Sequence, residues 1–86
     1  MNKFDIIKKY IDEFDYYSLL KIGAPNDEFD RYSKEFCNTI FKEDSVKDIA
    51  LVIAARLDTA FGNEVKAEKF LNTAEKIKNE LIRYNF

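Results

Sequence analysis

Residues 45–62 read SVKDIALVIAARLDTAFG, and this stretch decides the fold. Ser45 followed three residues later by Asp48 approximates a capping box, which marks the start of a helix. Apolar residues then recur at spacings of three and four as far as Phe61, and Gly62 provides a stop. The first half is apolar nearly all round, because the residues outside the main stripe are Ala50, Leu51, Ala54 and Ala55. We therefore expect this helix to be the central, most buried element, with the others packed around it.

Two helices are predicted on the N-terminal side of this stretch. The first covers residues 3–14, where the apolar stripe is Phe4, Ile7, Tyr10, Ile11 and Phe14. A short extra turn follows at residues 19–22 and is stopped by Gly23, and Ala24, Pro25 and Asn26 then turn the chain. The second helix is expected to open at residues 27–30, with Asp27 or Asp30 as its cap. Its stripe is Phe29 or Tyr32, then Phe36, Cys37, Ile40 and Phe41.

The C-terminal part of the chain predicts a last helix. Asn63 is its expected cap, and its stripe is Phe70, Ala74, Ile77, Leu81 and Tyr84. No segment alternates with the period of two that a strand requires. The predicted fold is therefore all-α: a four-helix bundle of antiparallel or nearly antiparallel helices, with a short connecting turn and a Gly-Ala-Pro loop between the first two.

Length and composition define the class of protein. The chain has 86 residues, which is enough for one small domain spanning residues 1–86, and 47% hydrophobic residues supply its core. The longest apolar run, residues 49–55, is far shorter than the ~20 residues of a membrane-spanning helix, and the N-terminus does not resemble a signal peptide. No stretch forms the basic stripe of a nucleic-acid binder. We expect a cytoplasmic protein that contacts neither a membrane nor DNA or RNA directly.

The residue types present exclude several kinds of chemistry. The chain has no histidine, which excludes Ser-His-Asp and Cys-His catalysis and histidine-ligated metals. Cys37 lies on an apolar helical face, where a thiol usually behaves as a small hydrophobe. The acidic run of Asp27, Glu28 and Asp30 does not complete a calcium loop, because Arg31 stands where that loop needs glycine. We expect no cofactor and no metal.

Paired carboxylates are the remaining route to enzyme activity. The candidates are Asp12, Glu13, Asp15, Asp27, Glu28 and Asp30. A carboxylate-based hydrolase needs a pocket that holds two of them, and a bundle of this size rarely offers one. We therefore favour a protein that is not an enzyme.

Tyr16 and Tyr17 are the most informative polar residues. They are adjacent, so on a helix they point about 100° apart and cannot both face the core. An exposed tyrosine beside acidic residues has the composition of an interface with a basic partner. The alternative is that one of the rings packs locally over the end of the first helix. The candidate partner-binding residues are Asp12, Glu13, Asp15, Tyr16, Tyr17, Asp27 and Glu28.

The stretch DYYSLLKIGAPNDEFD, residues 15–30, resembles the signature of the YugE-like proteins, small bacterial all-α proteins of unknown function. The matching residues are Leu19, Leu20, Gly23, Ala24, Pro25, Asp27, Glu28, Phe29, Asp30, Phe61 and Gly62. The chain lacks the tryptophan that the family tends to have before the Leu-Leu turn, and it has Arg31 and Tyr32 where Pro-Glu is usual. The resemblance implies a four-helix fold and supplies no catalytic residue.

Relatives of this kind are similar to small helical immunity proteins that are encoded beside bacterial toxins, such as those of contact-dependent growth inhibition. This similarity implies a non-enzymatic binding protein that neutralises a cognate toxin domain, with a nuclease as the concrete candidate. An acidic helical protein would associate rapidly with a basic substrate cleft. The alternative is a housekeeping scaffold or homo-oligomer in which the same surface is self-complementary.

Overall fold

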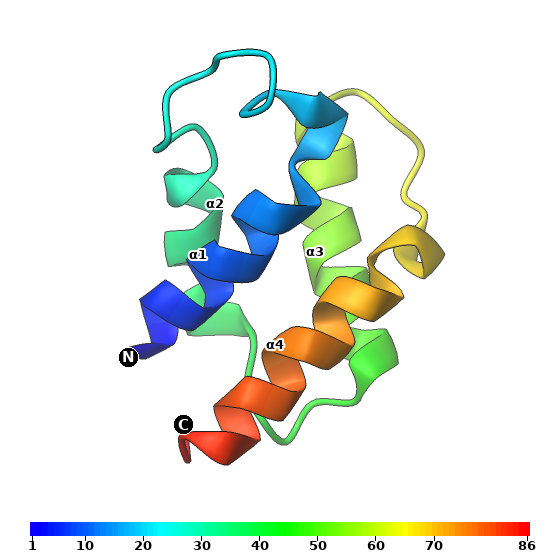
Figure 1. Ribbon diagram of the computed structural model, residues 1–86. Coiled ribbons are helices and arrows are strands. Elements are labelled where there is room, and N and C mark those ends of the chain that lie inside the picture. The colour runs from blue at the N-terminus through cyan, green and yellow to red at the C-terminus, as the bar shows by residue number, and fades with distance from the viewer.

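The computed structural model describes residues 1–86 and contains four α-helices and no strand. The helices are α1 (Lys3–Phe14), α2 (Asp30–Thr39), α3 (Val46–Ala60) and α4 (Leu71–Arg83). Two short 3₁₀ turns, η1 (Tyr16–Ser18) and η2 (Ala67–Phe70), lie before α2 and α4. Consecutive helices run in opposite directions, so both chain ends lie at one end of the bundle (Figure 1). The predicted all-α four-helix bundle is confirmed.

The helices form a ring in which each contacts two neighbours. α1 and α3 each pack against α2 and α4, so that α1 and α3 occupy opposite corners (Figure 1). The prediction that α3 is surrounded by the others is wrong, because Leu51 and Ala55 are exposed on its outer side. Two neighbours cannot cover the whole circumference of a helix. α3 nevertheless buries more residues than any other helix: Ile49, Ala50, Ile53, Ala54, Leu57 and Asp58.

One contiguous core lies between the four helices. Three phenylalanines, Phe29, Phe36 and Phe70, are its largest fully buried side chains. α1 buries Ile6 together with Ile7 and Ile11, and Phe4 of the predicted stripe is only half-buried. Because α1 packs against both α2 and α4, its buried arc is wider than a single stripe of three- and four-residue steps.

Three helix boundaries follow directly from the sequence. Asn2 caps α1, where its Oδ1 accepts a hydrogen bond from the Asp5 amide at 2.8 Å. Ser45 caps α3 as predicted, because its hydroxyl accepts from the Asp48 amide at 3.0 Å. Gly62 follows α3 with a φ of 75°, a left-handed conformation that glycine adopts at little cost.

Two predicted caps are wrong. The last helix does not begin at Asn63, because residues 63–66 are not helical and the chain enters α4 through η2. α2 begins at Asp30 with Phe29 at the cap position and no side-chain hydrogen bond to it, so neither Asp27 nor Asp30 is the cap. Two of these side chains make tertiary contacts in place of capping a helix. Asn63 donates hydrogen bonds to tyrosines, and Asp30 pairs with a lysine of α1.

Candidate functional site

The chain from the end of α1 through η1 has an unusual backbone. Asp15, Tyr17 and Ser18 have φ angles of 51°, 57° and 55°, in the left-handed region that residues other than glycine avoid. Each such residue costs about 1–2 kcal/mol. The Asp15 carboxylate stabilises the bend by accepting hydrogen bonds from the Leu20 and Lys21 amides at 2.7 and 3.0 Å. Strain that the surrounding structure holds in place tends to occur at functional sites.

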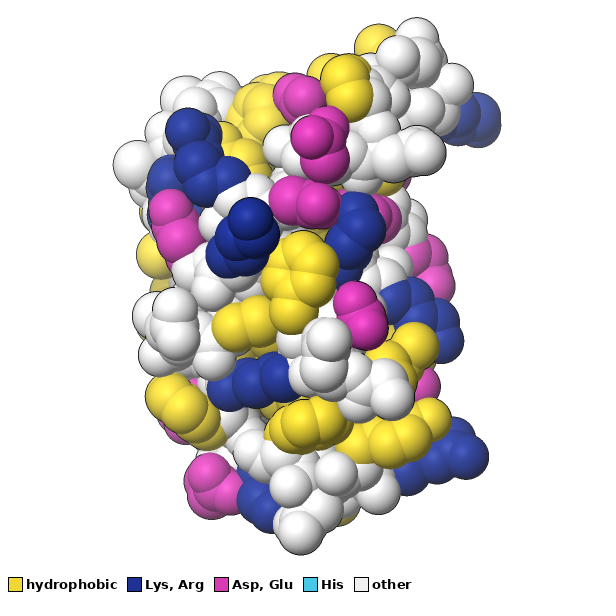
Figure 2. All heavy atoms as spheres, turned by 90° about the vertical axis from the view of Figure 1, so that its left-hand side faces the viewer, with side chains coloured by type: hydrophobic (Ala, Val, Ile, Leu, Met, Phe, Trp, Pro, Cys, Tyr) yellow, Lys and Arg dark blue, Asp and Glu magenta, His cyan; other side chains and the backbone are white.

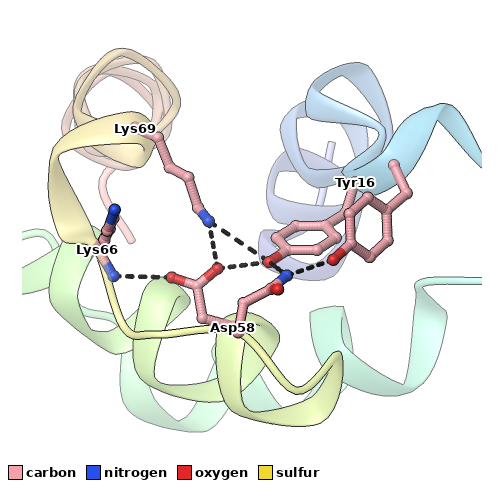
Figure 3. A network of polar contacts seen from close by, with 6 residues as sticks. Tyr16, Asp58, Lys66 and Lys69 are labelled. Carbon is pink, nitrogen blue, oxygen red and sulfur yellow. Dashed lines mark hydrogen bonds and ion pairs between the residues drawn. The ribbon is translucent and has the colours of Figure 1, made fainter.

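This bend turns Tyr16 into the core. The side chain is only 4% exposed, and its ring stacks on Phe61 with 4.7 Å between centroids. Its hydroxyl donates a hydrogen bond of 2.5 Å to Oδ1 of Asp58 (Figure 3). Tyr16 therefore packs locally within the core. This agrees with the alternative interpretation, in which one of the two rings packs over the end of the first helix.

Asp58 is a fully buried carboxylate on α3. Burial by itself would raise the pKa of Asp58, but hydrogen bonds from Lys69, Tyr16 and the Lys66 amide outweigh it, so this pKa is lowered. Lys69 Nζ lies 2.5 Å from Oδ1, and the Lys66 amide donates to Oδ2 at 2.9 Å (Figure 3). The same hydrogen bond from Lys69 to Asp58 raises the pKa of Lys69. The carboxylate thus joins the η1 bend, α3 and the chain around η2.

Tyr17 lies beside Tyr16 at the surface and is 59% exposed. Its ring stands edge-on to Tyr16 and Phe61, with centroids 4.9 and 5.5 Å away. Asn63 Nδ2 donates to its hydroxyl at 2.5 Å and also to that of Tyr16 at 2.8 Å. The prediction that at least one of the two tyrosines is exposed is confirmed. Tyr17 is an exposed ring whose position is fixed by its neighbours.

A shallow hollow lies beside Tyr17. Its volume is about 200 Å³ and its lining residues are Phe14, Tyr16, Tyr17, Asn63 and Lys69. No carboxylate lines it, and no other hollow is lined by two of the acids considered for a hydrolase. The arrangement offers aromatic surface for contact with another molecule.

Three of the predicted acids have roles inside the fold. Asp12 pairs with Lys8 at 2.7 Å, and Glu13 pairs with Lys76 of α4 at 2.6 Å. Asp15 stabilises the bend described above. These side chains would have to give up existing bonds before they could bind a partner.

The last two predicted acids, Asp27 and Glu28, are exposed and form no side-chain hydrogen bond or ion pair. They lie in the 19–29 segment, at the same end of the bundle as η1 (Figure 1). On the side of the molecule drawn in Figure 2, acidic side chains gather toward this end, with basic ones beside them. We call this end of the bundle, which carries Tyr17, Asp27 and Glu28, the Tyr17 end.

Lys8 anchors the 19–29 segment to α1. Its ammonium group lies 2.6 Å from the Asp30 carboxylate, 2.7 Å from Asp12 and 2.9 Å from the Asn26 carbonyl. Hydrogen bonds to Asp12 and Asp30 raise the pKa of Lys8. The segment that carries the two free acids is thus held at both of its ends, by Asp15 and by Lys8.

Sequence reasoning did not identify Asp58, Asn63 or Lys69 as members of this site. Asp58 had a usable signal: it follows Ala50 and Ala54 by eight and four residues, which places a carboxylate on a buried helical face. Asn63 and Lys69 lie in irregular chain and in a 3₁₀ turn, where no periodicity predicts what a side chain contacts.

No group of three or more Cys, Asp or Glu side chains is arranged to hold a metal ion. None of the helices combines the length and the apolar character needed to cross a bilayer. Comparisons with protein-family models, curated proteins and solved structures gave no match to this chain. The function proposed below therefore rests on the residues of this chain.

Proposed function

We propose that this chain is a non-enzymatic protein-binding module that contacts a basic surface of its partner through the Tyr17 end. The observation that carries the proposal is that Tyr17 is largely exposed and yet already fixed by Asn63 and the left-handed backbone. A ring with a fixed position loses little conformational entropy when a partner buries it. Tyrosine is also among the residues that contribute most of the free energy of binding at interfaces.

The charges of the Tyr17 end favour a basic partner. Asp27 and Glu28 have no internal counter-charge, so binding would break no bond that they make within the fold. Exposed charges of one sign accelerate association with a surface of the opposite sign. They also oppose self-association through this end, which disfavours the homo-oligomer built on the same surface.

In its most concrete form, the partner is a bacterial toxin domain and the chain is the immunity protein that neutralises it. A nuclease toxin must carry a basic surface for its polyanionic substrate, and an acidic protein that covers this surface would block it. The resemblance to small helical immunity proteins and the free carboxylates of the Tyr17 end support this form of the proposal.

The proposal can be tested by capturing the tagged protein from its native host and identifying what it retains. We expect a toxin domain in one-to-one amount, and we expect co-expression of the wild-type chain to restore growth to cells that produce this toxin. The double reversal Asp27→Lys with Glu28→Lys should weaken capture and abolish rescue. Glu43→Lys with Glu75→Lys is the matched control, because both residues are exposed and unpaired. No captured toxin, or equal rescue by both double variants, would contradict the proposal.

A further inference from the structure

α3 presents an exposed stripe on the outside of the bundle. Asp48, Leu51, Ala55 and Thr59 follow one another at spacings of three and four residues, and all of them are exposed. Leu51 is 51% exposed although it belongs to the most apolar part of the sequence. Residues 49–55 have the pattern of a helix that is covered on all sides, and one copy of the chain leaves this side uncovered.

The stripe is a ridge between two hollows. One, of about 330 Å³, lies toward α2, and Val52, Ala55 and Arg56 line it from α3. The other, of about 310 Å³, lies toward η2 and α4, and Leu51 and Leu71 line it. The surface therefore combines a projecting leucine with a hollow beside a small residue one turn further along the helix.

We propose that a second copy of this chain covers the stripe, with the two α3 helices antiparallel about a two-fold axis between Leu51 and Ala55. In this arrangement Leu51 of each copy lies against Ala55 of the other. A two-fold interface requires one surface that is complementary to itself, and a projecting leucine one turn away from a small residue meets this requirement. Packing a large residue against a small one is how helices interdigitate.

The charges around the stripe also favour a second copy. The stripe itself carries one charged residue, Asp48 at its beginning, while Arg56 lies beside it near its other end. Antiparallel packing brings Asp48 of each copy toward Arg56 of the other, where it can join the existing ion pair of Arg56 with Glu35. The antiparallel helix dipoles are favourable as well.

This inference is independent of the proposed function, because the stripe shares no residue with the Tyr17 end or its hollow. Loss of self-association and loss of toxin binding can therefore be separated. A stripe variant that is monomeric but still binds the captured partner would support both statements.

Sedimentation equilibrium over a concentration series tests the proposal. We expect the wild-type mass to rise toward twice the monomer mass, and Leu51→Glu and Ala55→Arg each to weaken association at least tenfold. Both positions are exposed, so the variants should fold, and circular dichroism checks this. Ile82→Glu is the matched control, since Ile82 is 53% exposed on α4 and lines none of the hollows. A wild-type chain that stays monomeric, or dimers that resist both α3 variants, would overturn the inference.

Discussion

The Tyr16 hydroxyl donates a hydrogen bond of 2.5 Å to Asp58 Oδ1, between residues 42 positions apart in the sequence. This bond connects the strained bend after α1 to the last turns of α3. Asn63 then links the same hydroxyl to Tyr17, so the position of the exposed ring depends on the buried carboxylate. The contact surface and the core are in this way parts of one hydrogen-bonded unit.

Removing this hydroxyl should destabilise the fold. We expect Tyr16→Phe to lower the free energy of unfolding by about 1.5–3 kcal/mol, because a hydrogen bond to a charged, buried group is lost. Tyr17→Phe is the control: its hydroxyl belongs to an exposed side chain, so the loss should stay within about 0.5 kcal/mol. Urea denaturation followed by circular dichroism measures both. Equal losses of unfolding free energy in the two variants would show that the Tyr16–Asp58 hydrogen bond stabilises the fold no more than the exposed one.

Asp58 should make stability depend on pH in acid. Its pKa is lowered in the folded state, so its contribution is fully present above the pKa of an unfolded aspartate, about 3.9, and is lost as the pH falls through the folded value. The difference in unfolding free energy between the wild type and Asp58→Asn should therefore be constant from about pH 6 to 5 and shrink below about pH 4. Urea titrations at each pH measure it. A difference that grows in acid would contradict the direction of the shift.

The left-handed bend should be strained at Ser18. Glycine has no penalty at a φ of 55°, so Ser18→Gly should raise the free energy of unfolding by up to about 1 kcal/mol. Ser18→Ala keeps the strain and should change little, because no hydrogen bond involves the Ser18 side chain. Thermal and urea unfolding of the two variants distinguish these outcomes. If Ser18→Ala raised the free energy of unfolding and Ser18→Gly left it unchanged, the backbone conformation of Ser18 would not be strained.

Lys8 should control the order of the 19–29 segment. Lys8→Ala removes the ammonium group that joins Asp12, Asp30 and the Asn26 carbonyl, so the segment should open more often. We expect faster tryptic cleavage after Lys21 and faster amide exchange in residues 20–28. Lys9→Ala is the control, because Lys9 is half-exposed and 3.9 Å from Glu80. Identical cleavage rates for the two variants would contradict the anchoring role.

Most of the fold could be predicted where local chemistry decides it. Helix α1, the Ser45 cap and the stop at Gly62 are set by neighbouring residues and by hydrophobic periodicity, and the structure confirms them. Local chemistry did not predict the role of Asn63. It has the composition of a cap, but two tyrosine hydroxyls compete for its amide, and their positions depend on the tertiary fold.

The candidate site was predictable only in part for the same reason. The exposure of one ring was predicted for two adjacent tyrosines on a helix, but the backbone at Tyr17 is not helical. Which ring faces outward depends on the left-handed backbone at Tyr17, which this residue type does not predict. The ion pair of Glu13 with Lys76, between residues 63 positions apart, likewise could not be predicted from local sequence patterns.

The most direct test of the account is an affinity titration of the captured partner domain with the wild type, Tyr17→Ala and Tyr84→Ala. Tyr84 is the matched control, since it is an exposed tyrosine at the opposite end of the bundle (Figure 1). The account predicts that Tyr17→Ala weakens binding at least 30-fold, about 2 kcal/mol, as expected of an interface hot spot, and that Tyr84→Ala stays within about twofold of the wild type. Equal affinities for Tyr17→Ala and the wild type would contradict the claim that the Tyr17 end is the binding surface.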